Sequence, residues 1–376
     1  MSDKPEIIEN TENQKVTVTV VIPVYNAYDF IRPCMDSVLD QTFRDIEVIC
    51  VDDGSTDHTL DILKEYQKAD TRVRIVTETN AGPAMARNAG LKRARGEYVI
   101  FLDADDFFEP ALIEKLYRKS KDNDLDIAIT KYDIYNSKKA RFYENADTVH
   151  NKIYGDGIVT SKNEYPDFIL QSTTGSAWNK MFKKTFLIEK NIQFLPDVMM
   201  FEDVYFTTCS LAFAERVSLV PDVLIHHRIY SEQSRAKRFK KYYSQVPAVY
   251  LKIKEFLMKG GMYQPLAKGF LNLTASRCFY IFGLLGSDAK EHFWKLLREN
   301  YDAQLGWQNH PAEDFESPEV CEFCANIELY TYDQYEKISK RGRKLDRSKI
   351  DQTLKQNRIR RRIWNFITKP FRKKEK

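Results

Sequence analysis

The first 130 residues alternate between short apolar segments and segments with helical periodicity, and this alternation constrains the fold more than any other feature. Strands that alternate with helices form parallel sheets through right-handed crossovers, so we predict an α/β fold with a mostly parallel, doubly wound, Rossmann-like sheet. The strands are almost continuously apolar, which predicts burial on both faces. The predicted strands are 16–24, 46–52, 73–78, 98–103 and 126–130, with helices around 31–39, 55–67, 82–94 and 110–123.

Polar residues follow three of these strands where each one ends. The ends read PVYN (23–26), DDGS (52–55) and DADD (103–106). In doubly wound sheets ligands bind at the carboxyl ends of the strands. We therefore expect these three segments to converge on one site.

The apolar run 98–102 leads directly into Asp103, Asp105 and Asp106. A strand followed by a polar turn is one explanation, and acids that share a metal ion are the other. An EF-hand loop is excluded because phenylalanines at 107 and 108 replace a ligand and the obligatory glycine. A haloacid-dehalogenase-like phosphatase would carry its D-x-D on the first strand rather than the fourth. We expect Asp106 only to cap the turn.

Charge is distributed unevenly along the chain. Residues 340–376 hold 16 Lys/Arg and three acids, a net charge of +13, so residues 1–339 carry −9 of the total of +4. This asymmetry indicates that only the tail has an anionic partner. We divide the chain into a polar N-terminal extension (1–15), an α/β domain (16–236), a helical C-terminal region (237–339) and a basic amphipathic tail (340–376).

No segment predicts secretion or membrane crossing. Residues 1–15 are polar and acidic, unlike a signal peptide. The most apolar stretch, 269–286, is interrupted by polar residues and falls short of the roughly 20 apolar residues that a spanning helix needs. With six cysteines in mostly apolar surroundings, the sequence predicts a reducing, cytoplasmic compartment. The pair Cys321 and Cys324 has no second ligand pair, so we do not expect zinc there.

Several segments together resemble the family 2 glycosyltransferases of GT-A fold. They are VVIPVYN (20–26), VICVDDGSTD (48–57), NAGPAMARNAGLKRARGEYVIFLDADD (80–106) and FEDVYF (201–206). WNK (178–180) and HHRIYSEQS (226–234) resemble features of bacterial members that build surface polysaccharides. The resemblance covers residues 16–235. It implies an inverting, metal-dependent hexosyltransferase that moves a sugar from a UDP-sugar to a hydroxyl of a glycan or lipid-linked glycan.

The resemblance also assigns the donor-binding residues. Asp53 would accept a hydrogen bond from uracil N3–H, which favours UDP, whereas the alternative is a turn in which Asp52 or Asp53 binds local backbone. Pro23 and Tyr25 would shape the other side of the base pocket. Arg87 would reach the nucleotide, unless it is only a surface charge.

The D-x-D segment is implied to hold Mn²⁺ or Mg²⁺. Carboxylate oxygens suit these ions, and a cation would stabilise the charge that develops on the departing diphosphate. Asp105 is the expected direct ligand. Asp103 would be a second ligand, directly or through water, or would contact the ribose.

Glu202 and Asp203 form a second carboxylate pair, in a segment (197–220) predicted to be helical from about Glu202. Acids at a helix start are favoured by the helix dipole without any catalytic role. The resemblance instead makes Asp203 the general base that takes the proton of the acceptor, and it assigns Glu202 to acceptor binding. One base opposite the leaving group implies single displacement with inversion.

Residues near 226–234 are implied to close over the diphosphate of the donor. Arg228 offers bidentate phosphate contacts, and Ser234 offers a hydroxyl. His226 and His227 are either metal ligands or structural residues. Trp178 either stacks on an acceptor sugar or belongs to the core.

In the tail, Lys and Arg alternate with large apolar residues, which predicts an amphipathic helix on an anionic membrane surface. This would place the protein peripherally at the inner face of the cell membrane. The alternatives are an idle, solvated tail and nucleic acid. We expect no nucleic acid, because the remainder of the chain is acidic and carries no nucleic-acid-binding motif.

Two other function classes fit part of the sequence. A nucleotidyltransferase, or a similar metal-dependent nucleotide-sugar enzyme, would need a Gly-rich, Lys-bearing loop near the first strand, and VVIPVYNAYDF contains no glycine. A degenerate GT-A scaffold that recruits partners to the membrane would not need the carboxylates, and all of these are present.

Overall fold

The structure is a computed structural model of the whole chain, and it describes residues 16–145, 149, 151–155, 157–196, 198, 200–229, 239 and 241–340. The chain divides into two compact units, Met1–Ala236 and Lys237–Lys376. The N-terminal extension and the basic tail from 341 onward lie outside the described residues.

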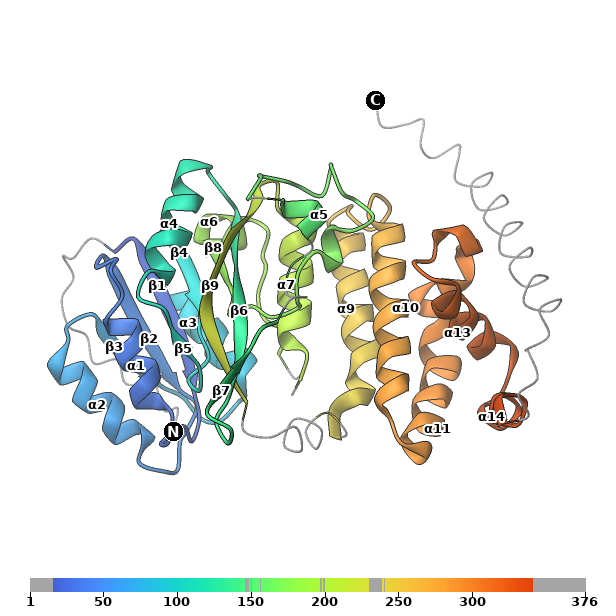
Figure 1. Cartoon of the computed structure of the whole chain (residues 1–376), viewed down its shortest axis with the longest axis horizontal. Helices are drawn as coiled ribbons and strands as arrows, with labels where there is room; N and C mark the ends of the chain where they lie inside the picture. The colour runs from blue at the N-terminus through green and yellow to red at the C-terminus, as the bar shows by residue number, and fades with distance from the viewer. Residues whose placement is uncertain are drawn as a thin grey trace, which may run out of the picture. The chain divides into compact units, whose positions relative to one another are not determined.

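The first unit is built on one mixed sheet of nine strands (Figure 1). The strand order is β3-β2-β1-β4-β8-β6-β9-β5, and β7 pairs with β6. The first four strands in this order are parallel, which confirms the predicted α/β fold. The strands are β1 (Val18–Val24), β2 (Ile46–Asp52), β3 (Val73–Thr77), β4 (Tyr98–Phe101), β5 (Phe107–Phe108), β6 (Ile127–Asn136), β7 (Arg141–Tyr143), β8 (Lys180–Lys183) and β9 (Val217–Ile229).

Helices cover both faces of the parallel part of this sheet. Alternate residues of β1 and β2 pack with α1, α2 and α4 on one face, and Ile49 and Val51 of β2 pack with α3 on the other. A Cβ on Gly90 of α3 would lie 2.3 Å from Val21 Cγ1, so the small residues of this helix permit its close approach to β1. The helices are α1 (Ile31–Leu39), α2 (Thr59–Ala69), α3 (Pro83–Arg93), α4 (Leu112–Asp122), α5 (Asn151–Tyr154), α6 (Lys184–Glu189) and α7 (Glu202–Phe213).

Residues 131–229 depart from the sequence prediction. Strand β8 lies antiparallel between β4 and β6, in a region that shows no clear strand pattern. The helix predicted over 197–220 is wrong after Phe213, because β9 starts at Val217. β9 runs parallel to β6 and then pairs with β5, with Phe107 opposite His226. This pairing brings the histidine-containing end of β9 to the residues that follow DADD.

The second unit is helical, as predicted. Its helices surround an aromatic core that includes the fully buried side chains of Phe293, Trp294 and Trp307. They are α9 (Val246–Lys259), α10 (Ala267–Leu284), α11 (Ser287–Leu296), α12 (Asp302–Leu305), α13 (Pro318–Leu329) and α14 (Tyr332–Lys340). Within the described part of the chain, every helix is too short or too polar to span a bilayer.

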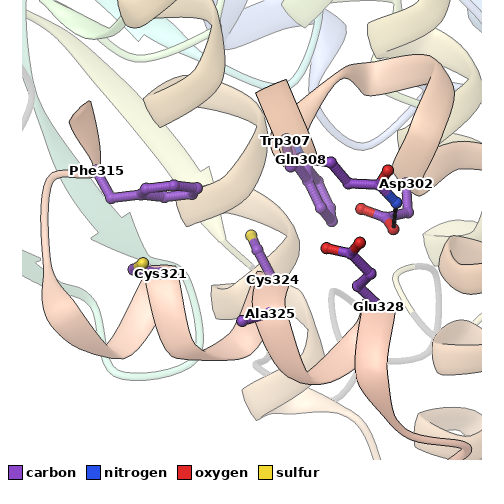
Figure 2. Close-up of a pocket in the computed structure, with 8 residues that line it drawn as sticks. All are labelled: Asp302, Trp307, Gln308, Phe315, Cys321, Cys324, Ala325 and Glu328. Carbon is purple, nitrogen blue, oxygen red and sulfur yellow. Dashed lines mark hydrogen bonds between the residues drawn. The ribbon is translucent and has the colours of Figure 1, made fainter. Parts of the chain in front are cut away.

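Figure 2 shows a small pocket in the second unit, where Asp302 and Glu328 face one another beside Cys324. Asp302 accepts a hydrogen bond from Gln308 Nε2 at 2.6 Å. Burial raises the pKa of Cys321 to about 11 and that of Cys324 well above its usual range. Both thiols are therefore neutral near pH 7, and a neutral thiol is a weak metal ligand.

Candidate active site

The loops after β1, β2 and β3 are tied together by hydrogen bonds at the carboxyl edge of the sheet. Asn26, with a φ of 48°, donates from its backbone N–H to Ser55 Oγ at 3.0 Å. Its side-chain oxygen accepts from the Thr56 N–H at 2.8 Å. The adjacent Tyr25 is 50% exposed, which leaves its ring accessible beside Pro23. The predicted convergence of the first two strand ends is therefore observed.

The Asp53 carboxylate joins β2 to the start of α3. Its two oxygens accept from the backbone N–H groups of Ala81 at 2.7 Å and Gly82 at 2.8 Å. The neighbouring Asp52 faces the Ser55 N–H instead, as a local turn residue does. Asp53 is thus buried and bound to non-local backbone, a partner that neither reading of the sequence specified.

Three carboxylates gather after β4, as the sequence predicts. Ligand atoms of Asp103, Asp105 and Asp106 lie within 4.8 Å of one another. Burial, together with the charges of Asp106 and Asp103, raises the pKa of Asp105 to about 7, although His227 opposes this effect. Like charges so close together are unfavourable without a cation.

Asp106 does more than cap a turn, which corrects the sequence prediction. Its carboxylate is fully buried and accepts from the backbone N–H of Arg228 at 2.8 Å. Both of its oxygens lie 3.1 Å from Nδ1 of His227. Asp106 therefore fastens the acidic turn to β9, a strand more than a hundred residues later in the sequence.

Arg87 of α3 lies among three carboxylates. Its Nη2 donates to Asp103 Oδ1 at 2.7 Å, and its Nη1 donates to Glu202 Oε1 at 3.0 Å. The same Nη1 is 3.2 Å from Oδ1 of Asp203. The side chain is buried, so Arg87 is not a surface charge, and its contacts in this structure are with the site's own acids. These ion pairs bring the end of β4 and the start of α7 together.

Glu202 and Asp203 occupy the first turn of α7. The preceding Phe201 has a φ of 74°, a left-handed conformation that costs a non-glycine residue about 1–3 kcal/mol and is concentrated at functional sites. Burial raises the pKa of Asp203 to about 7, because it outweighs the opposing effect of Arg87. No donor among the described residues forms a hydrogen bond with Asp203 Oδ1. The carboxyl is thus positioned but incompletely satisfied.

The end of β9 borders the acidic turn. Arg228 Nε donates to the backbone oxygen of Asp105 at 2.8 Å, and its guanidinium lies over the rings of Phe30, Phe107 and Tyr135. His226 lies between Glu109 and Asp133, at 3.0 and 2.7 Å. The sequence prediction for Ser234 concerns a residue outside the described ones.

Trp178 is a core residue in this structure. It is 6% exposed and stacks on His227 with ring centroids 4.9 Å apart. It also packs against Tyr132 in a T-shaped arrangement, with ring centroids 4.5 Å apart. Of the two alternatives that the sequence left open, the structure thus favours the core tryptophan over an acceptor-stacking residue. The buried Lys180 of the same WNK segment received no role from the sequence, although the segment itself was singled out.

The acidic trio could hold a divalent cation. Asp103, Asp105 and Asp106 offer only hard oxygen ligands, which suit Mn²⁺ and Mg²⁺. The Asp106 carboxylate already accepts a hydrogen bond from Arg228 of β9, and the Asp103 carboxylate forms an ion pair with Arg87. Asp105 forms no ion pair with Lys or Arg in the described part of the chain. These observations fit a cation bound through Asp105, with Asp103 beside it.

Known proteins share both the sequence pattern and the fold. Residues 19–188 match the model of the family described as Glycosyl transferase family 2. The chain is 30% identical over 267 residues to the putative glycosyltransferase EpsH of Bacillus subtilis, which covers 69% of this chain and 76% of EpsH. It is 38% identical over 169 residues to glycosyltransferase GlyA of Streptococcus pneumoniae, which covers 44% of this chain and 24% of GlyA. The chain thus spans only about a quarter of GlyA.

The fold is that of a solved GT-A structure. The crystal structure of S. aureus TarS 1-349 in complex with UDP-GlcNAc has a TM-score of 0.62 and 22% identity, covering 87% of this chain and 93% of that one. This likeness confirms the predicted GT-A architecture with its helical C-terminal region. Since the match to EpsH extends over most of both proteins, the chain belongs to glycosyltransferase family 2.

Proposed function

We propose that this protein is an inverting hexosyltransferase that moves a sugar from a UDP-sugar to a hydroxyl of a glycan or lipid-linked glycan in bacterial surface-polysaccharide synthesis. One observation carries the proposal. Arg87 lies 2.7 Å from Asp103 and 3.2 Å from Asp203. It therefore joins Asp103, which is assigned to the cation on the donor side, with Asp203, which is assigned to the acceptor.

The donor side is assigned to the ends of β1 and β2. Each oxygen of the Asp53 carboxylate accepts one backbone N–H and retains a second lone pair, which uracil N3–H would use. Tyr25 and Pro23 would form the opposite wall of the base pocket. Arg228 would approach the diphosphate, and we assign Ser234 to the same contact. The TarS complex contains UDP-GlcNAc, which supports a UDP-sugar as the donor class.

Asp105 and Asp103 would hold Mn²⁺ or Mg²⁺. When bound, the cation would neutralise the negative charge that develops on the diphosphate leaving group. Arg87 would keep Asp103 in place through its 2.7 Å contact. Asp106 would hold the turn against β9 rather than bind the cation itself.

Asp203 would act as the general base for the acceptor hydroxyl. A base is most effective when its pKa lies close to the working pH, and the pKa of Asp203 is about 7. In its ionised form the carboxylate would take the proton as the hydroxyl oxygen bonds to the anomeric carbon and UDP leaves. A single displacement of this kind inverts the anomeric configuration. Glu202, adjacent on the same turn, would contact the acceptor.

We assign the basic tail to an anionic membrane surface, where a lipid-linked acceptor would lie. This assignment rests on the sequence of residues 340–376. Removing the residues after Gln356 should release the protein from vesicles that contain phosphatidylglycerol. Unchanged vesicle binding would contradict the assignment.

The activity is tested by measuring UDP release from a panel of UDP-sugars, with and without Mn²⁺. We expect metal-dependent release, and Asp203→Asn should lower turnover by about 10²–10⁴-fold, the value of a positioned base. UDP affinity should be retained in this variant. Asp124→Asn is the matched control, because Asp124 is an exposed carboxylate that pairs with Lys183 at 2.7 Å. Near-normal turnover of Asp203→Asn would refute the assigned base.

A further inference from the structure

Lys180 is a buried lysine that pairs with no carboxylate in the described part of the chain. It is the first residue of β8 and is 0% exposed. Its Nζ donates to the backbone oxygens of Thr174 at 3.0 Å and Ser176 at 2.6 Å, and to Asn179 Oδ1 at 2.7 Å. All three ammonium protons are therefore used on neutral acceptors. Two of these acceptors belong to the loop that precedes β8.

This loop, residues 174–177, lies directly on the first turn of α7. A Cβ on Gly175 would be 2.8 Å from Val204 Cγ2 and 3.4 Å from Val204 Cα. The backbone N–H of Ala177 donates to the carboxyl of Asp203. The backbone oxygen of Ala177 in turn accepts from the Lys180 N–H at 3.2 Å. The Lys180 backbone N–H is thus linked through Ala177 to Asp203, and the Lys180 ammonium holds the same loop separately at Thr174 and Ser176.

The Lys180 ammonium is in turn connected to strand β6 through Asn179. Asn179 accepts from Lys180 and donates from Nδ2 to the backbone oxygen of Thr130 on β6 at 3.0 Å. The Thr130 N–H donates to the Asn179 backbone oxygen at 3.0 Å. Asn179 therefore connects the Lys180 ammonium to β6, and the ammonium binds the backbone of loop 174–177.

We propose that Lys180 is a positioning residue for glycosyl transfer, because it holds loop 174–177 against α7 and so fixes the Asp203 carboxyl in its reactive place. The inference rests on the proposed function of Asp203 as the base. Lys180 itself would touch neither donor nor acceptor.

Stability alone is a poor reason for a lysine at this place. An ammonium buried without a carboxylate loses its hydration, and an apolar side chain of similar length would avoid that loss. Burial lowers the pKa of Lys180 to about 7, and the charge of Asp203 opposes this change. The Lys180 ammonium and the Asp203 carboxylate therefore interact electrostatically, which is consistent with a role of the lysine in positioning the acid.

The test is the Lys180→Met variant, which keeps an unbranched side chain one atom shorter than lysine but removes the charge and all three hydrogen bonds. Displacing a catalytic group by about 1 Å costs up to about 100-fold in rate, so we expect kcat for transfer to fall between about 10- and 100-fold. The KM for the UDP-sugar and the affinity for UDP should stay within about twofold, because the variant removes no contact with the donor. Lys184→Met is the matched control, since Lys184 also donates to a backbone oxygen, that of Ala94 at 3.1 Å, and should leave kcat unchanged.

A second variant reaches the same contact without altering the lysine. In Gly175→Ala the new methyl would press on Val204, so kcat should fall with the same retention of donor affinity. If Lys180→Met fails to fold, Gly175→Ala decides. Lys180→Met and Gly175→Ala can each be combined with Asp203→Asn. Neither double variant should be slower than Asp203→Asn alone, because each change acts through the Asp203 carboxyl.

The possible failures are distinguishable. If Asp203→Asn keeps its turnover, the proposed base is wrong. If Asp203→Asn is inactive while Lys180→Met and Gly175→Ala retain full kcat, the role of Lys180 is overturned and the proposed function stands. A loss of donor affinity in proportion to kcat in Lys180→Met would also overturn it, because that result indicates a general structural role.

Discussion

Glu47 of β2 and Asp105, in the turn after β4, are both at least partly buried, but their surroundings shift the pKa of the carboxyl group in opposite directions. Glu47 lies near the start of β2, and its oxygens accept from Thr19 Oγ1, the Arg95 N–H, Arg95 Nε and Arg74 Nη1 at 2.6–2.9 Å. These donors outweigh its burial and lower the pKa of Glu47. Asp105 lies after β4, among other acids, and its pKa is raised to about 7.

We interpret this difference as one between a structural carboxylate and a carboxylate assigned to a ligand. The hydrogen-bonding capacity of the Glu47 carboxylate is satisfied by donors within the protein, so it has no need of an external ligand. Asp105 lacks such partners, and the missing positive charge would come from outside the protein. Arg87 occupies an intermediate place, because this one guanidinium partly neutralises Asp103, Glu202 and Asp203.

The largest expected effect comes from removing that internal cation. Arg87→Met would leave three acids without their counter-ion, and breaking a buried ion pair costs about 3–5 kcal/mol. Urea unfolding measures the loss. Arg72→Met is the control, because Arg72 is similarly shielded but pairs with the single carboxylate of Asp70 at 2.7 Å. A cost for Arg87→Met no larger than that of the control would contradict the bridging role.

The second-largest effect is expected from replacing Asp105, the acid that has no counter-ion among the described residues. Asp105→Asn should lower metal-dependent UDP release by about 10²–10³-fold, the usual effect of losing one electrostatic contributor. The fold should be unaffected, since Asp105 forms no ion pair with Lys or Arg among the residues described. Activity that persists in Asp105→Asn would remove the distinction between the two acids.

The opposite pattern is expected for Glu47→Gln. Hydrogen bonds to a charged group contribute about 1.5–3 kcal/mol, so unfolding free energy should fall by roughly that amount. Turnover per folded molecule should stay at the level of the unchanged protein. Unfolding curves and UDP release on the same samples check both parts, and a loss of turnover would show that Glu47 is not purely structural.

The smallest effect is a pH dependence of stability with opposite signs for the two acids. Folding raises the pKa of Asp105 from 3.8 to about 7. Its contribution is therefore fully present below about pH 4 and is lost as the pH rises toward 7, where the folded state no longer holds the extra proton. Glu47 has a lowered pKa, so its contribution is present above 4.5 and constant from pH 5.5 to 7.5.

In metal-free buffer, Tm should consequently decrease from pH 5.5 to 7.5. Asp105→Asn should reduce this slope, and Glu47→Gln should leave it unchanged. A slope that is the same in all three proteins would show that Asp105 is not the titrating group.

The sequence predicted the acids better than it predicted their partners. The strand ends that carry Asp53 and Asp105 could be placed at one edge because β-branched runs mark the strands and parallel strands end together. The choice of these two acids among their neighbours came from the family resemblance. The partners of Arg87 and Lys180 were not found, since the contacts of Arg87 with α7 span more than a hundred residues and those of Lys180 depend on a loop without periodicity. The strands β8 and β9 were missed for a similar reason, because their positions depend on pairing with β4 and β6 rather than on a local pattern.

The central claim is that Asp105 is left without a counter-ion in the described part of the chain so that, with Asp103 beside it, it binds a divalent cation together with the donor diphosphate. Electron paramagnetic resonance of Mn²⁺ in the presence of UDP measures this binding directly. The unchanged protein and Glu47→Gln should bind one Mn²⁺ per chain, and Asp105→Asn should not. Equal Mn²⁺ binding by Asp105→Asn, or no binding by the unchanged protein, would contradict the account.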